Sequence, residues 1–374
     1  MSDDRVASDL PRAARHIERG LTDGLHIGAV LAVRHGDRVY EGAWGEARRG
    51  VAATPRTLCL WLSSGKPVGA VCLARLWERG LLQLDDPVAR FVPEFAQAGK
   101  QAVTLRHILT HTGGFRQPLP APVAQPWHEI VQAVCRLPLE PGWVPGNKAG
   151  YHATSSWIIL GEVVRRIDGR PFERFARDEV FDPAGMADAH FAMSIEAYDG
   201  YGPRMGVLHE TPPRADGPRQ ASPVAWDTRE NAPLCRPGSS FRATAADLVA
   251  FYRTLLADLA GARTLLLAQT VEALVAPHRV GLLDHTFKHV MDWGLGIMVN
   301  SARHGVSTVP YRFGPHASAR TFGHAGAQSS TAFADPENRL IVAVHLNGMC
   351  GEKDHQPRMA DLLTSVYEDL GLGR

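Results

Sequence analysis

Strand-like patterns occur near both ends of this 374-residue chain, whereas helical patterns fill its middle. Residues 27–45 predict a β-hairpin, because two apolar runs flank the turn residues His35-Gly36-Asp37. Residues 340–345 form a continuous apolar run after a turn at 335–338, which is typical of a buried strand. An α+β fold accounts for this order: a central antiparallel sheet is assembled from both chain ends and flanked by helices, with a mainly helical insertion.

The order of these patterns divides the chain into two regions. Residues 1–60 plus 241–374 make the sheet region and residues 61–240 the mainly helical region, and we expect one unit with the site between them. Residues 194–240 are rich in Pro, Gly, Asp and Arg and have little periodicity, so we expect loops that border a pocket. Helices are predicted from Ser63 to Gly80, after Thr104, over 157–167, after the capping box Thr244-x-x-Asp247, and over 357–370.

The composition is that of an ordinary globular protein, with 45% hydrophobic and 21% charged residues. A net charge of +1 predicts no nucleic-acid partner, and no apolar run is long enough to cross a membrane. The first residues are polar and lack the apolar segment of a signal peptide. Five widely spaced cysteines include no Cys-x-x-Cys pair. These features together predict a cytoplasmic protein.

The stretch Ser63-Ser64-Gly65-Lys66 places a serine and a lysine three residues apart, just before a helical pattern. This spacing puts an amine beside a hydroxyl on one side of the helix start. A serine hydroxyl is a poor nucleophile until a base takes its proton, and a partly desolvated lysine can be that base. The free N–H groups of a helix start also favour negative charge. By itself, the same spacing also fits a serine N-cap followed by a solvated lysine.

Five local motifs, in this order along the chain, resemble the serine β-lactamase and penicillin-binding-protein superfamily. The most similar branch holds class C β-lactamases, D-aminopeptidases, family VIII esterases and lovastatin-type acyltransferases. The motifs are Ser63-x-x-Lys66, the stretch 105–114 (LRHILTHTGG), Pro141-Gly142 leading to Tyr151, the stretch 240–248 (SFRATAADL), and His324-Ala325-Gly326.

The resemblance implies a role for each matching residue. Ser63 would be the acylated nucleophile, and Lys66 would take its proton. Tyr151 stands where the family's Tyr-x-Asn motif begins and would relay a proton, with its pKa lowered if a neighbouring ammonium favours the phenolate. The backbone N–H groups of Ser63 and Ala327 would form the oxyanion hole.

His324-Ala325-Gly326 stands in place of the family's Lys-Thr-Gly strand. The resemblance therefore implies that His324 lies in the site and that Gly326 allows substrate to approach the strand closely. The change from lysine to histidine removes a fixed positive charge. In the motif that begins at Tyr151, Ala153 replaces the asparagine whose amide helps to bind a β-lactam in the β-lactamases. Both departures resemble the esterases and acyltransferases rather than an efficient β-lactamase.

Three further residues are candidates for the substrate pocket: His152, Trp143 and Trp226. For the two tryptophans, ordinary packing explains their presence equally well. The pairs His107/His111 and His285/His289 have helical spacing, but a metal site needs a third ligand, so no metal is predicted. The chain also lacks Gly-x-Ser-x-Gly and the glycine-rich nucleotide motifs, and we predict no cofactor.

The function predicted from these residues is acyl transfer through a covalent serine ester. If water resolves the acyl-enzyme, the protein is a carboxylesterase acting on small esters, which we favour. If an amine or alcohol does so, it is a transacylase of specialised metabolism, which is the alternative. A D-amino-acid peptidase or amidase and a non-catalytic ligand-binding homologue are further alternatives. The partner in each enzymatic case is a small-molecule ester, thioester or amide.

Overall fold

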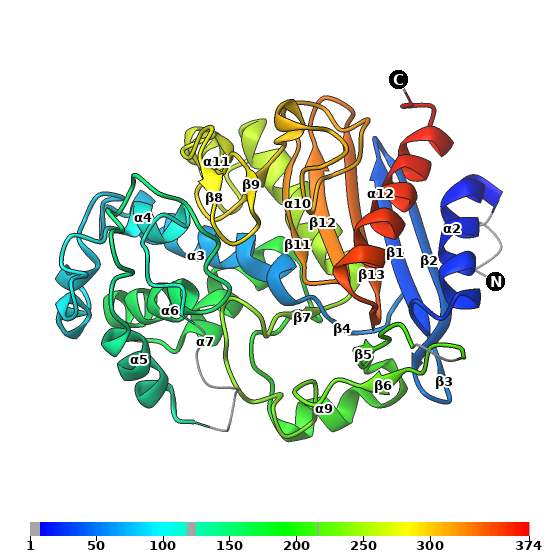
Figure 1. Ribbon diagram of the computed structural model, residues 1–374, viewed down its shortest axis with the longest axis horizontal. Helices are drawn as coiled ribbons and strands as arrows, with labels where there is room; N and C mark the ends of the chain where they lie inside the picture. Colours follow the sequence, from blue (N-terminus) through cyan, green and yellow to red (C-terminus); the bar gives the residue numbers. More distant parts are fainter. Residues whose placement is uncertain (1–7, 118–124, 215–216, 374) are drawn as a thin grey trace.

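The computed structural model describes residues 8–117, 125–214 and 217–373, and its α+β architecture confirms the predicted fold class (Figure 1). The central sheet has seven antiparallel strands in the order β10-β11-β12-β13-β1-β2-β3, so strands from the two chain ends are neighbours. The strands are β1 (Gly28–His35), β2 (Arg38–Arg48), β3 (Val51–Ala52), β10 (Met298–Val299), β11 (Phe322–Gly326), β12 (Ser330–Asp335) and β13 (Leu340–Leu346).

Both faces of this sheet are buried, and successive residues of a strand supply two different hydrophobic cores. In β1, Val30 and Ala32 belong to the core that continues into the helical region. Leu31 and Val33 belong to the core beneath helices α2 (Pro11–Thr22) and α12 (Glu352–Asp369). Because each face is covered, residues 28–33 of β1 and 340–344 of β13 are continuous apolar runs that do not alternate with polar residues.

Helix α12 lies beside α2 on one face of the sheet, and α10 (Ala245–Leu259) packs on the other (Figure 1). The helical region surrounds α3 (Lys66–Glu78), of which nearly every residue is buried. The remaining helices are α4 (Leu105–Leu109), α5 (Trp127–Arg136), α6 (Ser155–Asp168), α7 (Phe172–Ala176), α8 (Asp182–Ala184), α9 (Ile195–Tyr201) and α11 (Ala268–Val275).

Short strand pairs connect these parts. Strand β4 (Cys59–Leu60) pairs with β7 (Arg242–Ala243), and β8 (Leu283–Asp284) pairs with β9 (His289–Val290). Among the described residues of the stretch 194–240, the regular elements are the helix α9, the 3-10 helix η5 (Gly202–Arg204) and the strands β5 (His209–Glu210) and β6 (Ser222–Pro223). Strand β14 (Gly348–Met349) pairs with β5. No helix in the described part of the chain has the length and apolar character needed to span a bilayer.

The predicted helix starts at Thr104 and Thr244 are confirmed, since each threonine side chain caps the helix that follows it. The closing helix begins at Glu352, earlier than the predicted start at 357. Pro357 lies inside this helix, where it removes one backbone donor without ending the helix. Helix α2 was not predicted, and a hydrophobic core that spans both predicted regions joins them.

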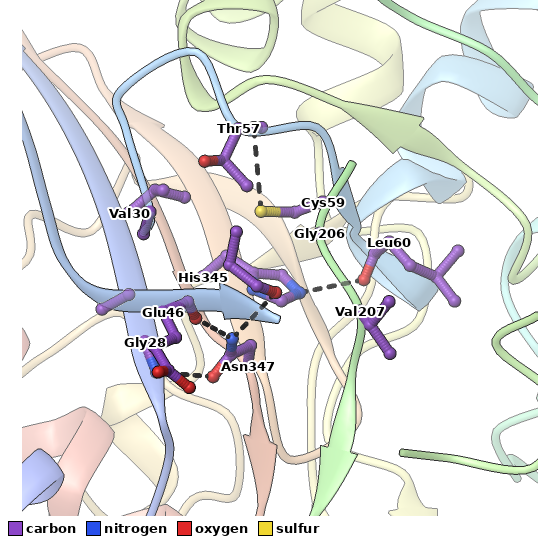
Figure 2. Close-up of a pocket in the computed structure, with 13 residues that line it drawn as sticks. Gly28, Val30, Glu46, Thr57, Cys59, Leu60, Gly206, Val207, His345 and Asn347 are labelled. Carbon is purple, nitrogen blue, oxygen red and sulfur yellow. Dashed lines mark hydrogen bonds between the residues drawn. The ribbon is translucent and has the colours of Figure 1, made fainter. Parts of the chain in front are cut away.

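A small cavity of about 10 Å³ lies where β4 meets the sheet, and Figure 2 shows its lining. At its wall, His345 Nε2 donates to Leu60 O at 3.0 Å, and the His345 and Trp61 ring centroids are 5.5 Å apart. Burial lowers the pKa of His345 to about 4, so its imidazole is neutral. The cavity has room for about one water molecule. These contacts attach the strand that precedes Ser63 to the sheet.

Candidate active site

Ser63 lies in a single 3-10 turn, η1 (Leu62–Gly65), immediately before α3. The turn is tightly constrained. Leu62 has a φ of +51°, which is uncommon for a residue other than glycine. A Cβ on Gly65 would lie 2.3 Å from the Phe241 Cβ, so only glycine fits there. Ser63 itself is half-buried, so part of its surface remains open to a ligand.

The Lys66 side chain is fully buried, and its amine lies among three oxygen atoms. Nζ is 2.8 Å from Ser63 Oγ, 3.0 Å from Ala153 O and 2.5 Å from Gly238 O. Burial lowers the pKa of Lys66 well below its usual value. A neutral amine has two N–H groups and one lone pair. Its N–H groups can therefore donate to the two carbonyls, which leaves the lone pair to accept the Ser63 proton.

The Tyr151 hydroxyl donates to Ser63 Oγ at 2.8 Å, so Ser63 contacts both an amine and a phenol. Burial raises the pKa of Tyr151, and the hydrogen bond to Ser63 offsets this only in part. The expected lowering of the tyrosine pKa by a neighbouring ammonium is therefore wrong for this resting state. The reason is that the same burial that raises the pKa of the phenol also disfavours the charged form of Lys66.

The backbone on either side of Tyr151 is held by His111. Gly150 N donates to His111 O at 2.9 Å, and His152 N donates to His111 Nδ1 at 3.1 Å. The His111 and Tyr151 ring centroids are 4.7 Å apart. His111 is fully buried, and burial lowers its pKa well below the usual value, so the ring is neutral. His111 thus contacts the Tyr151 ring and holds the backbone of the residues before and after it.

Asp284, at the end of β8, holds the Tyr151 main chain itself. Its Oδ1 accepts from Tyr151 N at 3.1 Å and from Thr286 N at 2.8 Å. The Thr286 hydroxyl donates to Tyr151 O at 3.0 Å. Asp284 Oδ2 pairs with Arg279 Nη1 at 3.0 Å, and both side chains are fully buried. This ion pair fixes the carboxylate that positions the tyrosine.

His324 lies on β11 and is 2% exposed. Its Nδ1 donates to Ala325 O at 2.7 Å, while Nε2 has no hydrogen-bond partner among the described residues. Burial, with a smaller effect of Lys66, lowers the pKa of His324 to about 3. The imidazole is therefore neutral at pH 7. Its ring centroid is 5.9 Å from that of Tyr151, which places it beside the Ser63 group.

The structure gives a packing reason for the glycine at position 326. A Cβ on Gly326 would lie 2.4 Å from Trp61 O and 2.3 Å from Ser330 Oγ, so the glycine allows β11 to contact the turn before Ser63. The approach of substrate to this strand stays a prediction. Ser330 Oγ also donates to Trp61 O at 3.0 Å. Ala327 follows directly and is exposed. This contact brings the N–H of Ala327 to the same end of β11 as Ser63.

The three pocket candidates lie in different surroundings. His152 is fully buried and its Nε2 accepts from Phe115 N, so it does not line an open pocket. Trp143 is buried too, and its indole donates to Thr112 O at 2.9 Å. For these two residues the structure favours a packing role. Trp226 is 36% exposed and lines a cavity, so its role in a substrate pocket stays a prediction.

Metal binding has no candidate site among the described residues, where no three His, Cys, Asp or Glu side chains converge. Each pair of histidines at helical spacing has other contacts. His107 Nδ1 accepts from Thr104 N, and His289 lies 3.0 Å from Thr308 Oγ1. The Ser63, Lys66 and Tyr151 group can perform nucleophilic chemistry from its own side chains.

Several residues of this site were not identified from the sequence. The Gly238 carbonyl, Asp284 and Arg279 are far from Ser63 along the chain and belong to no motif that we recognised. His111 lies within the LRHILTHTGG stretch, but its spacing from His107 indicated only a structural helix. Its φ of +57° places it beyond the end of α4, where its ring turns toward Tyr151.

Comparisons with known proteins agree with this geometry. The model of a family described as Beta-lactamase matches residues 13–364. Esterase EstB from Burkholderia gladioli is 32% identical over 207 residues, which cover 50% of this chain and 52% of EstB. A solved penicillin-binding protein homologue from Caulobacter crescentus is similar with a TM-score of 0.76 and 26% identity, over 96% of this chain and 97% of that one. The structure of EstCE1, a hydrolase with promiscuous acyltransferase activity, gives a TM-score of 0.74 at 20% identity, over 98% of this chain and 100% of that one.

Proposed function

The chain belongs to the beta-lactamase family, and from this we propose that it catalyses acyl transfer through a covalent ester on Ser63, with hydrolysis of a small carboxylic ester as its reaction. The observation that carries the proposal is the contact of Ser63 Oγ with both Lys66 Nζ and Tyr151 OH, each at 2.8 Å. A serine of purely structural role would not need both an amine and a phenol in contact with its one oxygen.

In the acylation step, the neutral Lys66 amine takes the Ser63 proton while Oγ forms a bond to the substrate carbonyl carbon. The N–H groups of Ser63 and Ala327 stabilise the oxyanion. The carbon–oxygen bond to the leaving alcohol then breaks, and the proton passes from Lys66 through Tyr151 to the departing oxygen. A water molecule repeats the sequence in reverse and releases the acid. The bonds and protons of these two steps balance without an external cofactor.

Esterase chemistry is favoured because two features reduce the match to a β-lactam. His324 is neutral where the family motif has a lysine, and Ala153 offers no side-chain amide. The local identity to Esterase EstB supports the same choice. A second candidate, transfer to an amine or alcohol, is supported by the fold similarity to EstCE1, whose acyltransferase activity is promiscuous.

The test is a short-chain 4-nitrophenyl ester given to wild type and to Ser63→Ala. We expect turnover and an acyl mass on the Ser63 peptide in wild type only. Adding candidate amines and weighing the products separates the two reactions, because a transacylase forms amide in proportion to amine concentration. Equal rates for wild type and Ser63→Ala would reject the enzymatic proposal.

A further inference from the structure

A second feature adjoins the turn formed by residues 236–240, which contacts Lys66 through Gly238 O: a cavity of about 70 Å³. Gly238 O accepts from Lys66 Nζ at 2.5 Å, and the next two residues, Ser239 and Ser240, line the cavity. The cavity therefore begins one residue along the chain from an atom that contacts the proposed base.

The turn is held rigidly, so its side chains keep a fixed position relative to Lys66. Ser240 Oγ accepts from Arg236 N at 2.8 Å and donates to Phe191 O at 2.5 Å. A Cβ on Gly238 would lie 3.0 Å from Ala153 O, the second carbonyl that contacts Lys66, so the turn packs directly on the site.

Arg236 lines this cavity without a compensating charge. Its Nη1 donates to Cys235 O at 2.9 Å, and no carboxylate of the described residues lies within ion-pairing distance. Nearby arginines differ, since Arg242 pairs with Asp227 at 2.5 Å. Burial lowers the pKa of Arg236, yet a guanidinium stays charged at neutral pH. A partly buried cation of this kind is stabilised when an anion joins it.

The other walls of the cavity suit a small organic anion. Arg242 also lines it, and its Nη1 is buried without a hydrogen-bond partner in the described residues. The half-buried Ser239 adds a hydroxyl, and the partly exposed Trp226 ring adds an apolar wall. Carboxylates bind guanidinium groups through two parallel N–H bonds, which this arrangement of donors can supply.

We propose that this cavity is a substrate subsite in which Arg236 binds a carboxylate carried by the ester, a specificity that rests on the proposed acyl transfer. The proposal names the substrate class as esters with an anionic group at a distance from the reacting carbonyl. It also means that a cation on the 236–240 turn, instead of the family's strand lysine, recognises the anion.

The test uses two esters that differ only in charge, 4-nitrophenyl hydrogen adipate and 4-nitrophenyl methyl adipate. We expect wild type to prefer the acid, with a kcat/KM ratio of about ten, since a hydrogen bond to a charged group contributes that order of discrimination. Arg236→Gln should bring the ratio close to one. Arg236→Lys should retain part of it, because an ammonium keeps the charge without the two parallel bonds.

A matched control is Arg320→Gln, an exposed arginine that lines a different cavity beside β10, and it should keep the wild-type ratio. A second pair, 3-carboxyphenyl butyrate and phenyl butyrate, tells whether the carboxylate belongs on the acyl or the leaving-group side. If wild type shows a ratio near one for both pairs, or if Arg236→Gln leaves the preference unchanged, the subsite does not exist.

Binding and acylation are read separately. The acyl mass on Ser63 from the methyl ester reports the proposed function alone. Calorimetric binding of the monomethyl adipate anion reports the subsite alone, and Arg236→Gln should weaken it about tenfold. Anion binding without acylation would reject the enzymatic proposal and keep the site. Acylation of Ser63 together with equal anion binding by wild type and Arg236→Gln would reject the subsite and keep the enzymatic proposal.

Discussion

At the scale of single residues, Lys66 determines what the site can do. Its side chain is fully buried, and burial alone lowers its pKa. A carboxylate partner would hold the amine in its charged form, and none of the described residues supplies one. Desolvation therefore favours the neutral amine, which is the state that a base for Ser63 requires.

The pH profile follows from this. Activity requires neutral Lys66, so log kcat/KM should rise with pH on an acidic limb and level off well below the usual lysine pKa. The apparent pKa of this limb is a property of the coupled Lys66 and Tyr151 pair and not of one residue. Rates of a neutral ester from pH 4 to 10 measure it. Lys66→Arg should be nearly inactive at every pH, because a guanidinium does not release its proton. A limb centred near pH 10.5 in wild type would contradict the mechanism.

A stability measurement tests the same lysine without any substrate. The pKa of Lys66 is lower in the fold than in the unfolded chain, so the unfolded state binds more protons than the fold between these two pKa values. In that window the free energy of unfolding of wild type should rise with pH, relative to Lys66→Met, by up to about 1.4 kcal/mol per unit. Urea titrations at several pH values give the slope. Parallel curves for the two proteins would show that Lys66 stays charged.

At the scale of elements, the β8–β9 hairpin supports the catalytic tyrosine of the proposed mechanism. Asp284 ends β8 and accepts from Tyr151 N, while the segment just after it supplies Thr286 to the Tyr151 carbonyl. On the other side, the residues after α4 supply His111. The phenol is therefore positioned by two elements that are far apart in sequence from each other and from Ser63.

Breaking this support should affect both stability and rate. Asp284→Ala leaves Arg279 buried without its charge partner and should lower the free energy of unfolding by about 3 kcal/mol. In the double variant Asp284→Ala with Arg279→Met no charge stays unpaired, so the loss should be smaller than the sum of the single losses. The double variant should still show kcat reduced by at least about tenfold, because Tyr151 is less well oriented. Unfolding curves and single-turnover rates check this, and an unchanged kcat would exclude a positioning role.

At the scale of the whole molecule, the helices nearest the two chain ends, α2 and α12, pack against each other. Asp369, at the end of α12, accepts from Arg12 N at 2.8 Å and from Ala13 N at 3.0 Å. It therefore caps the start of α2, for which no side-chain cap was found at Leu10. The pair α2 and α12 covers the face of the sheet opposite to α10 (Figure 1).

This closure predicts a stability effect that is independent of catalysis. Asp369→Ala should lower the free energy of unfolding by about 1 kcal/mol, the usual contribution of a helix cap. The rate of ester hydrolysis per folded molecule should not change, since Asp369 lies outside the site. Thermal unfolding and active-site titration provide the two measurements. A parallel loss of kcat would mean that the sheet transmits the change to Ser63.

The sequence by itself determined what depends on neighbours along the chain. The spacing of Ser63 and Lys66, the caps at Thr104 and Thr244 and the order of strands and helices are local, and they predicted the fold and the central pair of side chains. Only the tertiary structure decided the state of that pair. The carbonyls of Ala153 and Gly238 and the burial around Lys66 come from distant segments, and desolvation depends on what packs around a group, not on its spacing.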